Sequence, residues 1–114
     1  MVIERGQIYW CGLDPIQGHE EGKTRPVVII SADAYNKTQS PLTAVVPLTK
    51  AAAKTPLHLR FSRLQTGLEI DSTVLTDHAR FLDRSRLRGN AIGRLRADAL
   101  ALLDLQLARV FGLG

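Results

Sequence analysis

Gly22-Lys23-Thr24-Arg25-Pro26-Val27-Val28-Ile29-Ile30 is the stretch that decides the fold. Its last five residues, Pro26 to Ile30, form a continuous apolar run in which four β-branched residues follow a proline. A run of this kind predicts a strand buried on both faces, and a proline is tolerated at its first position. The residues before it, from Ile16 to Thr24, mix glycine and charged residues without periodicity. They predict a surface loop, which is the first place to look for function.

Further strands are expected on both sides of this run. Segments rich in strand-forming residues, or with alternating apolar residues, predict them at Gln7–Leu13, Leu42–Leu48, Leu57–Phe61 and Thr73–Thr76, with a further short strand around Ala91–Gly93. Ser31 is expected to cap a short helix over Ala32–Asn36.

From Arg96 onward the apolar residues recur with the spacing of a helix, so a terminal helix is expected there. Its apolar residues fall on one stripe that should cover the sheet: Leu100, Leu103, Leu107, Val110 and Phe111. Many short strands with one closing helix indicate a mainly β fold with a C-terminal helix, arranged as a small, partly open barrel.

Length and composition limit the class of protein. A chain of 114 residues with 45% hydrophobic residues suits one core, so a single domain over residues 1–114 is expected. The net charge of +4 favours polyanionic partners, because Lys and Arg displace the counterions condensed on phosphates. Cys11 is the only cysteine, which excludes an intramolecular disulfide and suits a reducing interior. No stretch resembles a signal peptide or a membrane span, so we expect a cytoplasmic protein without a membrane partner.

The sequence gives no reason to expect a metal or a cofactor. His19, His58 and His78 lie in different segments without the spacing of metal ligands, so no metal site is predicted. The glycines at 18 and 22 lack the spacing of a nucleotide-binding loop and precede a strand rather than a helix.

Several segments, in colinear order, carry a resemblance to a known family. They are Arg5–Trp10, Gly22–Ile30, Asp33–Asn36, Val45–Thr49 and Leu75–Asp83, and they span nearly the whole chain. In this order they resemble the MazF/PemK family of toxin-antitoxin endoribonucleases. The resemblance implies an SH3-like barrel of the CcdB/PemK type, a homodimer, an acidic antitoxin partner and no cofactor. It also implies sequence-selective, metal-independent cleavage of single-stranded RNA.

Arg25 and Thr49 match the two positions that this family uses for catalysis. The residue types suit this role, because attack by a 2′-hydroxyl builds negative charge on a pentacoordinate phosphorus, and a guanidinium donates two aligned hydrogen bonds to its oxygens. A hydroxyl at Thr49 can add a third donor. Such attack leaves 2′,3′-cyclic phosphate and 5′-hydroxyl ends and cannot cut DNA. Without the resemblance, Arg25 would be a surface charge before a strand and Thr49 a turn residue.

The cleavage reaction also needs a general base that removes the proton of the 2′-hydroxyl. Some PemK-like members use a His of the first loop and an Asp after the fifth strand, and His19 and Asp77 match these positions. This chain has Leu75 where those members carry an arginine. Glu20 and His19 are the candidate bases, and the alternative is that both are ordinary solvated loop residues.

Several polar residues near these positions are candidates for binding RNA: Lys23, Thr24, Lys50, His78 and Arg80. The cluster of arginines between Arg80 and Arg96 either extends an RNA groove or keeps the surface soluble. The loop from residue 14 to 24 is expected to gate the groove.

Leu102 and Leu105 fall opposite the core stripe of the terminal helix and are candidates for a dimer interface. A rival function is that of CcdB-like proteins, which share the barrel and poison DNA gyrase by binding it. Such a poison needs no paired phosphate donors and is expected to end in an apolar or Trp-bearing helix tip, whereas Trp10 lies in the first strand. An inactive structural member would look the same in sequence.

Overall fold

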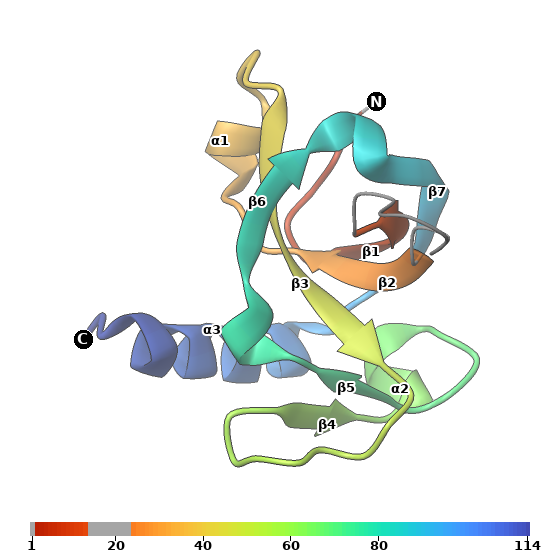
Figure 1. The fold of residues 1–114 in the computed structure, drawn as a ribbon, viewed down its shortest axis with the longest axis vertical. Helices are drawn as coiled ribbons and strands as arrows, with labels where there is room; N and C mark the ends of the chain where they lie inside the picture. Colours follow the sequence, from red (N-terminus) through yellow and green to blue (C-terminus); the bar gives the residue numbers. More distant parts are fainter. Residues whose placement is uncertain (1, 14–23) are drawn as a thin grey trace, which may run out of the picture.

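The computed structural model describes residues 2–13 and 24–114 (Figure 1). Its elements follow in the order β1 (Gln7–Gly12), β2 (Thr24–Ile29), α1 (Asp33–Asn36), β3 (Leu42–Thr49), β4 (Leu59–Phe61), α2 (Arg63–Thr66), β5 (Ser72–Val74), η1 (Thr76–His78), β6 (Arg80–Asp83), η2 (Arg84–Arg86), β7 (Leu87–Arg94) and α3 (Ala97–Phe111), where η marks a 3-10 turn.

The strand predicted from Pro26 to Ile30 lies inside a seven-stranded antiparallel sheet, but β2 spans Thr24–Ile29, so it begins at the end of the predicted loop, where Thr24 pairs with Gly12 of β1. The strand order is β4-β5-β3-β2-β1-β7, and β6 pairs with the first half of β3. Val27, Val28 and Ile29 are fully buried, as the apolar run predicts. Among the described strands, β4 and β7 end the order without pairing with each other, so the curved sheet stays open. The predicted fold class, mainly β with a C-terminal helix and a partly open barrel, is confirmed.

Alternate side chains of the sheet pack into two apolar clusters. On β2, Val28 joins the cluster under α3, together with Ile8, Val46, Leu48, Phe61, Val74, Leu95, Ala99, Leu103 and Leu107. Val27 and Ile29 point to the other face, where they pack with Ile3, Tyr9, Cys11, Leu13, Val45, Leu82 and Leu87. A strand whose two faces both meet a core must be apolar at every position, which is why this run could be identified from sequence.

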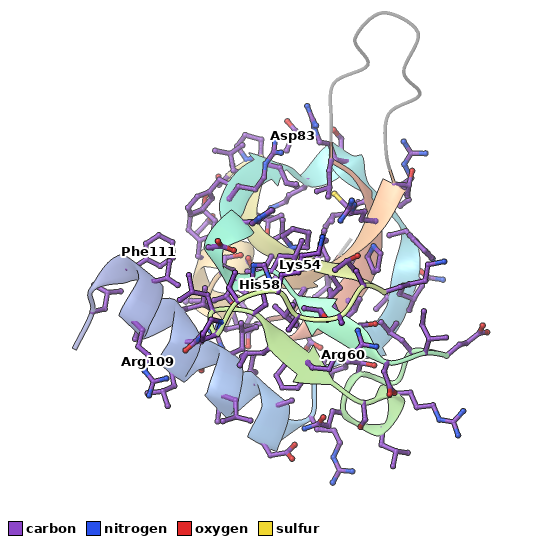
Figure 2. All side chains as sticks on the ribbon, turned by 60° about the horizontal axis from the view of Figure 1, so that its bottom comes forward. Lys54, His58, Arg60, Asp83, Arg109 and Phe111 are labelled. Atoms are coloured by element: carbon purple, nitrogen blue, oxygen red, sulfur yellow. The ribbon has the colours of Figure 1, made fainter. Side chains whose placement is uncertain are left out.

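Helix α3 crosses one face of the sheet, and its C-terminal end extends past it (Figure 1). Leu103 and Leu107 are buried as predicted, but Phe111 is 58% exposed at the C-terminal end of the helix (Figure 2). The prediction that Phe111 belongs to the core stripe is therefore wrong, because no sheet lies beneath the last turn. Gln106 is buried in the stripe instead and donates a hydrogen bond to the Pro56 carbonyl at 2.7 Å. None of the described helices has the length and apolar character that a membrane span requires.

Some element boundaries differ from the predictions for physical reasons. Strand β6 was not predicted, and β7 covers Leu87–Arg94 rather than Ala91–Gly93, because most of β7 faces solvent and carries no alternating pattern. Strand β4 begins at Leu59 rather than Leu57, since the His58 amide closes a turn onto the Thr55 carbonyl.

Two further local predictions need correction. Ser31 does not cap α1, where Ala32 is the N-cap residue; the Ser31 hydroxyl donates instead to Asn36 Oδ1 at 2.6 Å. Strand β5 ends at Val74 rather than Thr76, because Thr76 opens the 3-10 turn η1.

Candidate active site

Arg25 and Thr49 come together because they lie on neighbouring antiparallel strands. Strands β2 and β3 pair with Val27 opposite Pro47. Extending this register by two residues, toward the start of β2 and the end of β3, places Arg25 opposite Thr49. Both side chains are half-buried, and both line one open cleft of about 830 Å³.

This cleft also contains two of the residues predicted to bind RNA, Thr24 and Lys50. The rest of the lining comes from β1, β2, β3, β5, β7 and the segment after α2, which also brings the acidic Glu69 to the cleft. Part of this lining is apolar: Trp10, Pro26, Leu48, Leu68, Ile70 and Ile92. The Trp10 side chain is 45% exposed, so an indole face is accessible beside the polar groups. Within residues 2–13 and 24–114, no acidic side chain forms an ion pair with Arg25.

The backbone after Thr49 is held by a residue that the sequence did not single out. Arg60 Nη1 donates hydrogen bonds to the carbonyls of Lys50 and Ala51, at 2.9 and 3.0 Å, and to Thr73 Oγ1 at 2.9 Å. The Ala51 amide in turn donates to Thr49 Oγ1 at 3.3 Å. This bond uses the Thr49 oxygen only as an acceptor, so its hydroxyl proton is available for a ligand in the cleft. Arg60 therefore positions Thr49 through the backbone that follows it.

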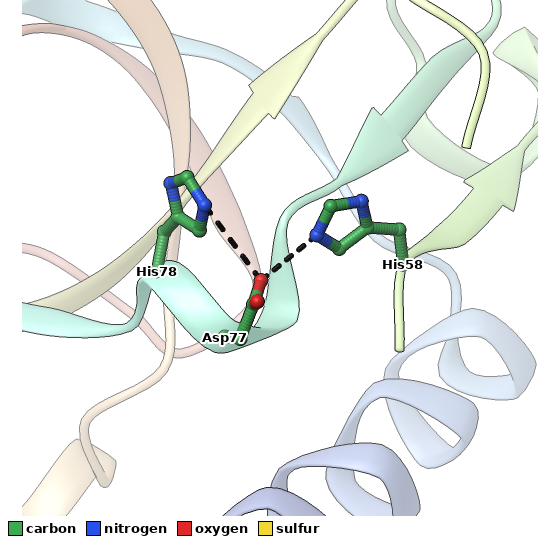
Figure 3. Close-up of side chains that lie close together, drawn as sticks. All are labelled: His58, Asp77 and His78. Atoms are coloured by element: carbon green, nitrogen blue, oxygen red, sulfur yellow. Dashed lines mark hydrogen bonds and ion pairs between the residues drawn. The ribbon is translucent and has the colours of Figure 1, made fainter. Parts of the chain in front are cut away.

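Asp77 and His78 lie in η1 and meet a histidine from a distant segment. Asp77 Oδ1 is 2.8 Å from His58 Nε2 and 3.7 Å from His78 Nε2 (Figure 3). The hydrogen bond from His58 is the main reason why the pKa of the Asp77 carboxyl is lowered, and burial opposes this shift. None of these residues lines the cleft that holds Arg25 and Thr49. His58 and His78, which lie in separate segments of the sequence, are therefore neighbours in space.

The sequence profile of the PemK-like, MazF-like toxins of type II toxin-antitoxin systems matches residues 4–111. The chain belongs to this toxin family. It is 40% identical over 89 residues to the endoribonuclease MazF of Staphylococcus epidermidis, an alignment that covers 76% of this chain and 73% of that protein.

Solved structures from this family have the same fold. Crystal structures of MazF and of a MazE-MazF complex from Deinococcus radiodurans are 33% and 32% identical in sequence. Their TM-scores are 0.78 and 0.82, with 98% of both chains covered in the first case and 100% of this chain and 99% of that chain in the second. The resemblance to MazF and PemK seen in the sequence is thereby confirmed.

Arg80 is the last of the RNA-binding candidates that lie within the described residues. Its side chain contacts the backbone of this MazF-like fold. Its Nη1 donates to the Leu13 carbonyl at 3.2 Å, and Arg86 Nη1 donates to the same oxygen at 3.0 Å. Both guanidiniums therefore hold the end of β1, next to residues 14–23. Cys11 is buried nearby, where burial raises the pKa of its thiol and the charges of Arg86 and Arg80 oppose that shift. His19, Glu20 and Lys23 lie outside the described residues.

Proposed function

We propose that this chain is an endoribonuclease toxin that cuts single-stranded RNA in the cleft containing Arg25 and Thr49. The observation that carries the proposal is the placement of a guanidinium and a hydroxyl in one open cleft. Its relative in Staphylococcus epidermidis is named an endoribonuclease, which supports the same reaction here.

The proposed reaction is an internal transesterification. The 2′-hydroxyl oxygen attacks the adjacent phosphorus while the bond from phosphorus to the 5′-oxygen breaks. A base takes the proton of the 2′-hydroxyl, and an acid protonates the departing 5′-oxygen. The products are a 2′,3′-cyclic phosphate and a 5′-hydroxyl. Because the nucleophile is already tethered beside the phosphorus, the step needs no metal-bound hydroxide.

Arg25 and Thr49 bear the charge that develops in this step. The Arg25 guanidinium donates two parallel hydrogen bonds to the equatorial phosphate oxygens, and the Thr49 hydroxyl donates a third. Their half-burial strengthens these bonds relative to water. Arg60 contributes indirectly, by holding the Lys50 and Ala51 carbonyls and with them the position of Thr49.

The base is assigned to Glu20 or His19 rather than to Asp77. A carboxylate whose pKa is lowered, as that of Asp77 is, accepts protons poorly at neutral pH. Asp77 also does not line the cleft. Glu20 and His19 belong to the segment that directly precedes Thr24 and Arg25, although both lie outside the described residues.

Sequence-selective binding uses polar groups around the phosphate and one aromatic face. Thr24 and Lys50 in the cleft, with Lys23 just before it, contact the RNA backbone, and a base stacks on the accessible indole of Trp10. His78 and Arg80 contact RNA beyond the cleft.

Two protein partners are proposed. An acidic antitoxin segment binds the same cleft, because carboxylates reproduce the charge of the phosphates; the Deinococcus radiodurans structure of a MazE-MazF complex supports such a partner. A second copy of the chain packs on Leu102 and Leu105, which are 49% and 52% exposed on α3.

The proposal is tested with Arg25→Ala and a matched control, Arg96→Ala. The Arg96 side chain is 67% exposed, and Arg96 does not line the cleft. With a mixed RNA pool and sequencing of the ends, Arg25→Ala should cut about 100-fold more slowly or worse, because it removes charge-stabilising donors. Arg96→Ala should stay within a few-fold of wild type. Equal activity of the two variants would refute the assignment of Arg25.

A second experiment tests the reaction class. An RNA with a single 2′-deoxy substitution at the cleavage step should bind through its other phosphates but resist cleavage. Cleavage of the unmodified RNA should persist in excess EDTA. Cutting of the deoxy substrate would show that the nucleophile is not the 2′-hydroxyl. A loss in EDTA that added metal restores would show that the reaction is not metal-independent.

A further inference from the structure

Two histidines and an aspartate converge on the surface where the segment before β4 meets η1. We propose that His58, Asp77 and His78 form a binding site for a zinc ion. This proposal does not depend on the cleavage chemistry, because none of the three residues lines the cleft that contains Arg25 and Thr49. A zinc ion on His78 would compete only with the RNA contact proposed for that side chain outside the cleft. The site would be an additional property of the molecule, and it can be measured without RNA.

The donor atoms already stand close to the geometry that zinc requires. Both imidazoles direct Nε2 toward the same carboxylate oxygen, Asp77 Oδ1, at 2.8 Å from His58 and 3.7 Å from His78 (Figure 3). One ligand atom from each residue lies within 4.8 Å of the others. Zinc bonds of about 2.0 Å in a tetrahedron separate neighbouring ligand atoms by roughly 3.3 Å. The two distances to Asp77 Oδ1 bracket this value, and the separation between the two histidine ligand atoms is at most 4.8 Å, so rotation of the exposed side chains can bring the three ligands to an ion.

The two segments that carry these ligands are held in place by other contacts. The His58 amide donates to the Thr55 carbonyl at 3.1 Å, and Gln106 of α3 donates to the Pro56 carbonyl at 2.7 Å. On the other side, the His78 amide donates to the Leu75 carbonyl at 2.8 Å. These bonds fix the ligand backbones before any ion arrives, which lowers the entropy lost on binding.

The chemistry of the three ligands suits zinc better than a hard cation. Imidazole nitrogens with one carboxylate oxygen form a common ligand set for zinc, whereas calcium and magnesium prefer oxygen donors alone. A zinc ion would replace the proton between His58 Nε2 and Asp77 Oδ1, and the neutral imidazole of His58 would then carry its proton on Nδ1.

Exposure of the cluster permits an ion to reach it and leaves room for a further ligand. The side chain of His58 is 11% exposed, whereas those of Asp77 and His78 are 38% and 56% exposed. With three protein ligands, the fourth tetrahedral position faces solvent and would hold a water molecule. A bound ion would also join the segment before β4 to η1, so it should stabilise the folded chain.

The experiment is a calorimetric titration of the metal-free full chain with zinc chloride, repeated for three variants. His78→Gln and Asp77→Asn each remove one ligand at an exposed position, and circular dichroism should show that both keep the wild-type fold. Asp98→Asn is the matched control, because it removes an exposed carboxylate on α3 that pairs with Arg96 instead. Cobalt in place of zinc provides a visible absorption signal for tetrahedral coordination.

Wild type and Asp98→Asn should each bind about one zinc per chain, with a higher melting temperature in its presence. His78→Gln and Asp77→Asn should bind at least about tenfold more weakly, since loss of even an outer-shell partner costs about 10- to 100-fold, and neither should give the tetrahedral cobalt spectrum. An absence of saturable binding in wild type would overturn the proposal. Undiminished binding by the two ligand variants would do the same, because the zinc would then be held elsewhere.

Discussion

Replacing Gly93 by alanine should separate β7 from α2, although the change adds only one methyl group. A Cβ atom at this position would lie 2.5 Å from the Thr66 carbonyl oxygen and 3.1 Å from Leu68 Cδ2. The first of these is a backbone atom at the end of α2, which Gly67 terminates with a φ of 76°. A backbone oxygen cannot rotate away as a side chain can, so the strand and the helix must move apart.

The size of the effect follows from the distance. Ordinary contact for a Cβ atom begins at 3.4 Å, so the gap is about 0.9 Å too small. Overpacking of this kind typically costs about 1–3 kcal/mol. For a chain of this length, that cost corresponds to a melting temperature roughly 5–20 °C lower. Because Gly67, Leu68 and Ile92 line the cleft, the shift should also reach the proposed active site.

Thermal denaturation of Gly93→Ala against Gly12→Ala provides the measurement. A Cβ atom at Gly12 would meet the Arg88 guanidinium at 3.1 Å, and this is the far end of a flexible side chain that can move aside. Gly12→Ala should therefore change the free energy of unfolding by less than about 0.5 kcal/mol. If both variants melted at the same temperature, the close approach of β7 to α2 would be refuted.

Three further predictions concern the core, the buried thiol of Cys11 and the outer face of α3. Leu103→Ala should lower the free energy of unfolding by about 2–5 kcal/mol in urea denaturation because Leu103 is fully buried, whereas Leu64→Ala, at a side chain that is 77% exposed, should change it little. Burial raises the pKa of the Cys11 thiol, so native protein at pH 8 should react with a thiol reagent far more slowly than unfolded protein; equal rates would contradict this. Leu105→Glu should weaken self-association in sedimentation, and an unchanged dimer or a monomeric wild type would contradict the proposed interface.

The fold could be predicted from sequence wherever packing imposes a pattern on the chain. Strand β2 meets apolar clusters on both faces, so its run of β-branched residues was unambiguous. Strand β7 pairs with β1 but exposes most of its side chains, so nothing in its composition separates it from a charged loop. Phe111 continues the helical period past the point where the sheet ends. The helical period predicts which way a side chain points. It cannot show whether other residues lie there for that side chain to pack against.

The candidate site, like the fold, could be predicted only in part from the sequence. Arg25 and Thr49 could be named because each lies at a recognisable strand end within a family motif. Arg60 and His58 could not be, because their roles depend on partners 10 and 19 residues away in the chain. In the sequence, Arg60 is an outward residue of an alternating strand and His58 is an isolated histidine. Strand β5 pairs with β4 on one side and with the end of β3 on the other, and this arrangement brings Arg60 to the backbone after Thr49.

The arginines between Arg80 and Arg96 show why net charge alone is a weak guide to RNA binding. Arg80 and Arg86 donate to the Leu13 carbonyl, Arg84 donates to the Leu42 carbonyl at 3.0 Å, and Arg94 pairs with Glu4. These guanidiniums satisfy backbone oxygens and a carboxylate that would otherwise need water, which is a structural use of the charge.

Among the described residues, the cations that line the cleft are Arg25 and Lys50. A surface with few cations at its centre makes few phosphate contacts there, so its affinity for RNA should depend only moderately on salt. Selectivity must then come from groups other than charge, and Trp10 and Thr24 stand in the same cleft to supply it. The high arginine content of this chain therefore serves the fold at least as much as the substrate, and the number of charges in the cleft is the better measure of RNA binding.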